Sequence, residues 1–194
     1  MPMEKGKDNL LPRFNLPVNV DFQRHGVEEL CVLESADSSR SFSDSDIETI
    51  TEICGEETVY NVLFKERFKG RSYTKKDAKE YIAWAQEGWK KEGHFVFLIR
   101  DKSGNIVSAV DIKSNNIESA EIGYWSSSET PGVMTNAVVA LCGVARKAGF
   151  KELYGLTVPE NEKSQAVLVR AGFDNKDPLE EEGKSYIKYS KVLI

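Results

Sequence analysis

The sequence predicts an α/β fold in which helices flank a mixed, mostly antiparallel central sheet. Three segments rich in β-forming side chains, between residues 94 and 125, are separated by tight turns, as in an antiparallel meander. After them the apolar spacing alternates between helical and extended patterns, which predicts a helix, a strand, a second helix and a final strand. Further segments with helical spacing precede the meander. This order of elements is typical of a mixed α/β domain and differs from that of a repeat array or a β-sandwich.

The chain of 194 residues has the length of one domain with an extension. Residues 1–26 are polar, contain three prolines and lack clear periodicity, so we expect an extended N-terminal arm there. The domain itself is then expected to cover residues 27–194, beginning with a strand over residues 28–34.

Helical spacing marks three segments between this first strand and the meander. Ser43 or Asp44 is the expected N-cap of the first helix, whose apolar stripe consists of Ile47, Ile50, Ile53 and Cys54. Residues 59–68 are expected to form a second helix. Thr74 is expected to cap a third helix over residues 75–91, with a buried stripe of Ala78, Tyr81, Ile82, Ala85 and Trp89.

The second half of the chain has a clearer pattern of elements. Strands are expected over residues 94–100, 106–113, 119–125, 151–158 and 185–194. Helices are expected over residues 132–147 and 159–170, with Gly149 ending the first and Pro159 in the opening turn of the second. The α/β alternation therefore continues to the end of the chain.

The charge and cysteine content exclude several classes of protein. A net charge of −5 argues against a general nucleic-acid binder, which needs clustered cations against phosphates. The three cysteines, Cys31, Cys54 and Cys142, form no pair with metal-ligand spacing, and two of them lie in apolar runs. The N-terminus lacks an apolar signal region, and no run reaches the roughly 18 apolar residues of a membrane helix. We expect a cytoplasmic protein without metal, nucleic acid or membrane as partners.

The turn into the helix at residue 132 has the features of an anion site. Backbone N–H groups at a helix N-terminus lack intrahelical acceptors, and the helix dipole adds a partial positive charge. Gly132 has no Cβ, so a pyrophosphate group is expected to approach the backbone closely. The alternative is that Gly132 only begins the helix.

Three segments around this turn resemble the GNAT acetyltransferase superfamily, and within it the RimJ/RimL-type acetyltransferases of ribosomal proteins and small amines. They read AEIGYW, GVMTNAVVAL and VPENEKSQAVLVRAGF, and the last matches the family in the spacing of Asn161, Ser164, Leu168, Gly172 and Phe173. The resemblance implies a GNAT fold and an acetyl-CoA-dependent N-acetyltransferase. Its acceptor would be a protein N-terminus or a small amine, and a homodimer is compatible with the resemblance.

The same resemblance assigns residues to acetyl-CoA. The thioester and pantetheine would lie against Tyr124, Trp125 and Ser126, and Asn161 would hold the pantetheine arm. The pyrophosphate would bind the backbone N–H groups of Gly132, Val133, Met134 and Thr135. The sequence departs from the family's loop pattern at Glu129, where a basic or amide side chain is usual, and at Met134, where a tiny residue is usual. We expect Glu129 to point away from the pyrophosphate.

Two residues are candidates for the chemistry. Ser164 would lie near the sulfur and donate a proton to the leaving thiolate, with Tyr124 as a second choice, since Leu168 stands where many relatives have a tyrosine. Glu121 shares a strand face with Gly123 and Trp125, so an apolar wall beside it would raise its pKa and make it a general base. The alternative for Glu121 is a surface carboxylate that pairs with a neighbouring strand.

A second hypothesis for the whole chain is a non-catalytic GNAT-fold module that binds acyl-CoA as a sensor or scaffold. Glu129, Met134 and the missing tyrosine at Leu168 favour this alternative.

Overall fold

A computed structural model describes residues 10–181 and 183–194. Over these residues, the strands are β1 (Asn19–Gln23), β2 (Leu30–Ser35), β3 (Phe95–Arg100), β4 (Ile106–Ile112), β5 (Ala120–Ser126), β6 (Glu152–Thr157), β7 (Asp174–Glu181) and β8 (Lys184–Val192). The helices are α1 (Asp44–Gly55), α2 (Glu57–Leu63), α3 (Lys75–Lys90), α4 (Val133–Ala148) and α5 (Glu162–Arg170). The predicted α/β class is confirmed, and the elements that were predicted occur in the predicted order.

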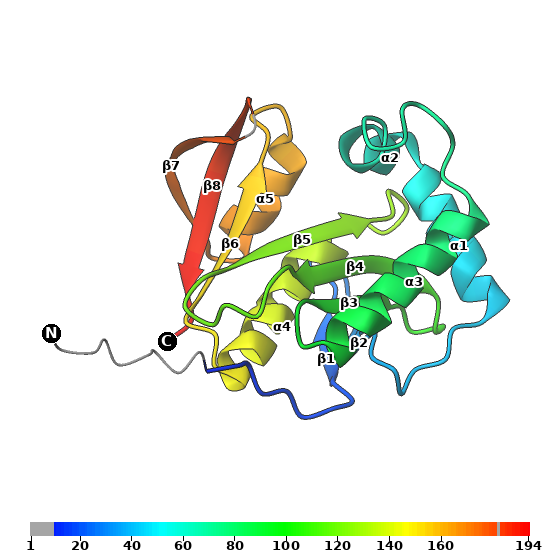
Figure 1. Ribbon diagram of the computed structural model, residues 1–194, viewed down its shortest axis with the longest axis horizontal. Helices are drawn as coiled ribbons and strands as arrows, with labels where there is room; N and C mark the ends of the chain where they lie inside the picture. Colours follow the sequence, from blue (N-terminus) through cyan, green and yellow to red (C-terminus); the bar gives the residue numbers. More distant parts are fainter. Residues whose placement is uncertain (1–9, 182) are drawn as a thin grey trace, which may run out of the picture.

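All strands belong to one sheet, in the order β1-β2-β3-β4-β5-β6-β8-β7, and every neighbouring pair except β5 and β6 is antiparallel. The parallel pair is held only at its beginning, where Ala120 lies opposite Leu153 and Glu121 opposite Tyr154. Beyond this point the two strands diverge (Figure 1). The sheet is therefore mixed, mostly antiparallel, and open between β5 and β6.

The helices cover both faces of the sheet, and each face has its own hydrophobic core. One core joins α4 and α5 to the sheet, through residues such as Phe97 and Leu141. The other joins α1 and α3 to the opposite face, through residues such as Leu98 and Ile50. Because adjacent residues of a strand face opposite sides, β3 is buried on both, which explains its continuous apolar sequence.

Side chains at the starts of α1 and α3 fix where these helices begin. Ser43, not Asp44, is the N-cap of α1: its Oγ accepts the N–H of Asp46 at 3.1 Å, while Asp46 accepts the N–H of Ser43 at 2.8 Å. Asp77 in α3 likewise accepts the N–H of Thr74 at 2.9 Å. The predicted cap at Thr74 is confirmed.

The expectation of an arm without regular structure through Gly26 is wrong for residues 19–23, which form β1 at the edge of the sheet. The segment before β1 also packs on the domain, since the Phe14 ring lies 5.0 Å from that of Trp89. β1 escaped prediction because an exposed edge strand needs few apolar residues, and the sequence NVDFQ has only two. The part of the expected arm over residues 1–9 lies outside the described residues.

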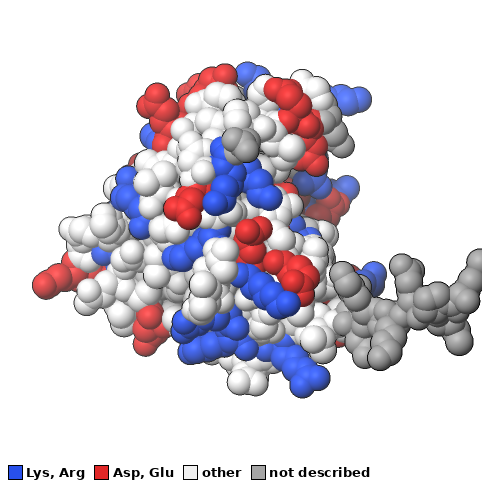
Figure 2. All heavy atoms as spheres, turned by 90° about the vertical axis from the view of Figure 1, so that its left-hand side faces the viewer, with Lys and Arg blue, Asp and Glu red and all other residues white. Residues whose placement is uncertain are grey.

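Two helix boundaries and one strand also differ from the sequence prediction. The helix expected over residues 59–68 is α2, which ends at Leu63 and continues as turns. The helix expected from Pro159 begins at Glu162, after the capping residue Asn161. β7 was not predicted, because its sequence DNKDPLEE is polar and contains Pro178, which an edge strand tolerates. Acidic and basic side chains are interspersed on the side of the molecule that β7 and β8 form (Figure 2).

Candidate functional site

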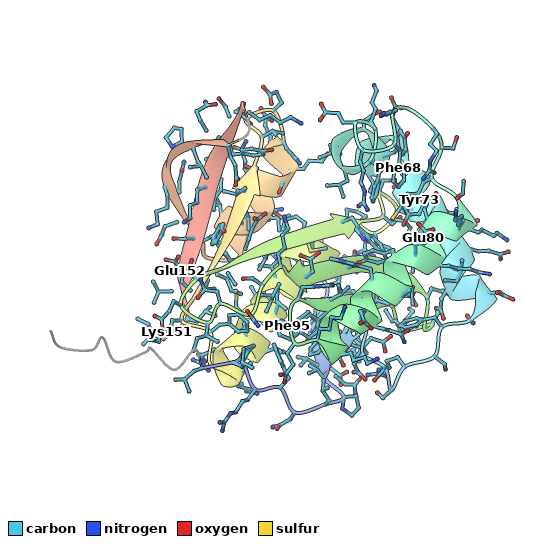
Figure 3. The ribbon with its side chains drawn as sticks, viewed as in Figure 1. Phe68, Tyr73, Glu80, Phe95, Lys151 and Glu152 are labelled. Carbon is cyan, nitrogen blue, oxygen red and sulfur yellow. The ribbon has the colours of Figure 1, made fainter. Side chains whose placement is uncertain are left out.

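The opening between β5 and β6 exposes the backbone of β5. The N–H of Lys113 donates to the carbonyl of Glu121, and the N–H of Ser127 donates to the carbonyl of Val107, so odd-numbered residues of β5 pair with β4. Backbone groups alternate in direction along a strand, and those of Tyr124 therefore point toward β6. Past the joined end, marked by Lys151 and Glu152 in Figure 3, β6 is too far away to pair with them. An extended ligand can bind this free edge.

Tyr124 and Ser164 meet beside the opening. The Tyr124 hydroxyl lies 2.7 Å from the Ser164 Oγ and donates to the Ser164 carbonyl at 3.1 Å. Burial raises the pKa of Tyr124 to about 12, so the phenol stays protonated at neutral pH. The structure thus brings together the two residues that the sequence offered separately as proton donors.

Asn161 caps α5 by accepting the N–H of Ser164 at 3.1 Å. Its cap fixes the turn that carries the Ser164 side chain. Among the residues that the structure describes, none accepts a hydrogen bond from the Asn161 amide nitrogen. The side chain therefore combines a structural role with two N–H donors that a ligand can use.

The turn at Gly132 differs from expectation in what approaches it. Gly132 has a φ of +89°, and a Cβ there would lie 2.6 Å from the carbonyl oxygen of His25. The N–H of His25 donates to the Gly132 carbonyl at 3.1 Å, and Arg24 Nε donates to the Pro131 carbonyl at 2.6 Å. The missing Cβ thus makes room for the β1–β2 loop. The approach of a pyrophosphate to the same backbone stays a prediction.

The first turn of α4 still offers free backbone donors. Among the residues that the structure describes, no side chain caps the helix. The side chains of Val133, Met134 and Thr135 are buried, which leaves the approach to the helix end to backbone groups. Burial of Met134 also explains why a large residue is tolerated where relatives have a tiny one.

Two charged residues lie near this end of α4, and the sequence analysis considered only one of them, Glu129. The Glu129 side chain is exposed on the loop before Gly132. Arg170, at the end of α5, donates through Nε to Thr135 Oγ1 at 3.3 Å and brings a cation to the first turn of α4. Sequence reasoning missed Arg170, because only the packing of α5 on α4 places it there.

Trp125 and Ser126 differ in what they present to the opening. The Trp125 side chain is buried in the core beneath α1 and α3, and its backbone pairs with β4, so the structure does not bring it to the opening. Ser126 has the same backbone direction as Tyr124, and its Oγ lies 2.6 Å from that of Ser108. Of the two, Ser126 remains available to a ligand.

Glu121 lies at the joined end of β5 and β6 and forms an ion pair with Lys113 of β4. The Lys113 side chain lies beside this carboxylate, where the sequence analysis expected an apolar wall. The alternative stated for Glu121, a partly exposed carboxylate paired with the neighbouring strand, describes its surroundings.

A second carboxylate on the same face, Asp111 of β4, was not singled out from the sequence. Its Oδ1 accepts the N–H of Gly123 at 3.0 Å, and burial raises the pKa of Asp111. A polar residue within the predicted strand IVSAVDIK was the available signal, since a strand buried on both faces rarely carries an unpaired acid.

Among the described residues, no helix is sufficiently long and apolar to span a membrane. Within the same residues, His, Cys, Asp and Glu side chains form no group of three suited to a metal ion. The three cysteines are buried and free, as expected from the sequence.

Comparison with known proteins identifies the family. The acetyltransferase (GNAT) domain family matches residues 40–174, which is more than half of the chain. No curated protein matches the sequence.

Solved structures show the same fold. A ribosomal-protein-S5-alanine acetyltransferase from Vibrio fischeri has a TM-score of 0.68 at 22% identity, covering 90% of this chain and 96% of its own. RimJ of Mycobacterium smegmatis, solved with CoA-disulfide, has a TM-score of 0.72 at 18% identity, covering 91% and 88%. Spermidine N-acetyltransferase from Vibrio cholerae, solved with CoA and spermine, has 0.65 at 15%, covering 84% and 95%. The chain belongs to the acetyltransferase (GNAT) domain family and is an N-acetyltransferase.

Proposed function

We propose that this protein transfers the acetyl group of acetyl-CoA to a primary amine, by direct attack of the amine on the thioester in the opening between β5 and β6. The observation that carries the proposal is the free edge of β5 at Tyr124 and Ser126, beside the Tyr124–Ser164 contact. The pantetheine arm would lie along this edge, with Asn161 donating to it from the start of α5. Trp125 would contribute only by supporting the strand.

The pyrophosphate would bind at the start of α4, to the backbone N–H groups of Gly132, Val133, Met134 and Thr135. Arg170 would add a cation, which the loop itself lacks. Glu129 is exposed, which supports the expectation that it points away from the phosphates.

Ser164 would donate a proton to the thiolate as the C–S bond breaks, and Tyr124 would replace that proton across their 2.7 Å contact. The tetrahedral oxyanion would be stabilised by a backbone N–H at the free edge of β5. Glu121 and Asp111 lie on the face of the sheet opposite to Tyr124, and their carboxylates are candidates to take the proton of the amine. Glu121, held by Lys113, would act through a water molecule.

Three of the solved relatives are named for their acceptors, which are the alanine or serine residue of a ribosomal protein and the polyamine spermidine. Both are primary amines that are protonated at neutral pH. We propose that the acceptor of this protein belongs to the same class, and that the protein works in the cytoplasm, where its buried thiols stay reduced.

The test is to measure acetyl-CoA affinity by calorimetry and CoA release with three probes: peptides beginning with alanine, peptides beginning with serine, and spermidine. Release of CoA with one probe and not with buffer supports the proposal. Binding of acetyl-CoA without turnover of any probe would instead support the non-catalytic acyl-CoA-binding module, which Leu168 at the usual tyrosine position favours. Absence of acetyl-CoA binding would contradict both.

A further inference from the structure

Neighbouring residues of β5 have side chains on opposite faces of the sheet. Tyr124 reaches α5 and Ser164, on the face that α4 covers. Gly123, next to it, faces the other side, which α1 and α3 cover (Figure 1). A thioester held at the edge of β5 would therefore have the proton donors Tyr124 and Ser164 on one face of the sheet and the Gly123 position on the other.

The Asp111 carboxylate occupies the space above Gly123. A Cβ on Gly123 would lie 3.0 Å from Asp111 Oδ1 and 2.9 Å from Lys113 Cε, so any other residue would force these side chains to shift. The Gly123 N–H donates a hydrogen bond to the Asp111 carboxylate and holds it beside Gly123, the residue directly before Tyr124. Asp111 is thus tied to the part of β5 where the thioester would lie.

Asp111 has no ion-pair partner among the residues that the structure describes. The nearby Lys113 is paired with Glu121 instead. The other titratable groups that face Asp111 are Tyr81 from α3 and His94 just before β3. An enclosed carboxylate without a cation is unfavourable, and its natural complement is an incoming ammonium group.

Tyr81 and Trp125 lie near Asp111 on the same face of the sheet. The indole N–H of Trp125 is buried, and among the described residues it makes no hydrogen bond within the usual geometric limits. The centroids of the Tyr81 and Trp125 rings lie 6.0 Å apart, within the core that α1 and α3 form with this face.

We propose that Asp111 binds the ammonium group of the acceptor and acts as the catalytic base, on the face of the sheet opposite to Tyr124 and Ser164. This inference rests on the proposed function. Asp111 takes one proton from the ammonium group, and the neutral amine attacks the thioester carbon. The C–N bond forms, the C–S bond breaks, and the thiolate takes a proton from Ser164. The second proton lost by nitrogen passes to solvent and balances the one that restores the Tyr124–Ser164 pair.

The surroundings of Asp111 suit this role. Burial raises its pKa and the nearby Glu121 adds to the effect, while Lys113, the Gly123 N–H and His94 oppose it. Asp111 keeps some contact with solvent, yet protein atoms crowd the carboxylate enough for desolvation to prevail. A base with a raised pKa accepts the proton of an ammonium group with a smaller energetic penalty than an ordinary aspartate.

The decisive variant is Asp111→Asn, which keeps the shape and the acceptor oxygen for the Gly123 N–H. We expect kcat/KM for the best amine probe to fall about 100-fold or more, with KM for the amine raised and the acetyl-CoA Kd within twofold of wild type. The part of the pH profile in which kcat/KM rises as Asp111 loses its proton should disappear. Glu118→Gln, which removes an exposed carboxylate paired with Lys151, is the charge-matched control and should leave activity unchanged.

Glu121→Gln separates the two candidate bases. If Asp111 is the base, this variant frees Lys113 to pair with Asp111, and the rising limb of the pH profile moves to lower pH but persists. If Glu121 is the base, the limb disappears in Glu121→Gln and persists in Asp111→Asn, which overturns the inference. Activity of Asp111→Asn within threefold of wild type also overturns it. Lack of acetyl-CoA binding or turnover by the wild type rejects the proposed function and the inference together.

A measurement on the wild-type protein covers the case in which Asp111→Asn does not fold. Carboxyl ¹³C NMR follows the titration of Asp111 with and without spermidine. We expect the titration midpoint to fall when spermidine is present, because a bound cation stabilises the carboxylate. An unchanged midpoint at saturating spermidine would contradict the role of Asp111 in binding the amine.

Discussion

The hydroxyl group of Tyr124 lies 2.7 Å from that of Ser164 and joins β5 to α5 beside the opening in the sheet. Each residue comes from a segment that resembles the family, but their contact depends on the packing of α5 against the end of the diverging strand. Under the proposed function this contact would supply the proton for the thiolate, since the sequence has Leu168 where many relatives have a tyrosine.

Tyr124→Phe should slow acetyl transfer about 10- to 100-fold while leaving the acetyl-CoA Kd nearly unchanged, because it removes one proton donor and keeps the ring. Steady-state kinetics with the best amine probe measure the change. Tyr60→Phe is the matched control, because it removes a hydroxyl on α2 that donates a hydrogen bond to the Arg71 carbonyl. Equal kcat in Tyr124→Phe and wild type would exclude a role for this hydroxyl.

Two substitutions of Asn161 separate its cap from its binding role. Asn161→Ala should lower the free energy of unfolding by about 1 kcal/mol and weaken acetyl-CoA binding. Asn161→Asp keeps a good capping oxygen but loses the N–H donors, so we expect nearly unchanged stability with weaker binding. Urea unfolding and calorimetry test both. Wild-type affinity in Asn161→Asp would show that the side chain serves only as a cap.

Gly132→Ala should destabilise the protein by roughly 2 kcal/mol or more, since φ is +89° and the new Cβ would meet the His25 carbonyl at 2.6 Å. Gly143→Ala is the matched control in the same helix: no atom lies within 4 Å of the Cβ position, and alanine should stabilise by about 0.5–1 kcal/mol. Chemical unfolding measures both changes. Equal effects of the two substitutions would contradict the fit of the β1–β2 loop against Gly132.

Arg170→Ala should weaken acetyl-CoA binding several-fold, and the loss should shrink as salt is added, because the cation would act on the phosphates through charge. Arg146→Ala, which removes a cation at the other end of α4, is the control. Binding measured at two salt concentrations is sufficient. A salt-independent loss would indicate that Arg170 acts through the packing of α5 on α4.

Asp77→Asn should destabilise α3 in a pH-dependent way. The Arg71 guanidinium and the N-terminus of α3 hold the pKa of Asp77 well below its usual range. A lowered folded-state pKa contributes stability above the unfolded value of about 3.9, and that contribution is lost as pH falls toward the folded value. The difference in Tm between wild type and Asp77→Asn should therefore be largest near neutral pH. Glu80→Gln, an exposed change on the same helix, should show no such trend.

Sequence patterns were sufficient to predict those elements whose structure depends mainly on their own residues. The capping sequences at Ser43 and Thr74, and the apolar stripes behind them, set the start and the buried face of α1 and α3. The meander of β3, β4 and β5 followed from β-forming residues and turns. β1 and β7 were missed for the opposite reason, since edge strands are stabilised by a neighbour that their own sequence does not reveal.

The sequence by itself determined the α/β class, most of the elements, and the segments at 120–126 and 161–173 that resemble the family. Only the tertiary structure decided which side chains meet. It placed the His25 carbonyl against Gly132, Arg170 at the start of α4, and the Asp111 carboxylate above Gly123. The reason is physical: caps and periodicity act over a few residues, whereas these contacts arise from the packing of elements that are far apart in the chain.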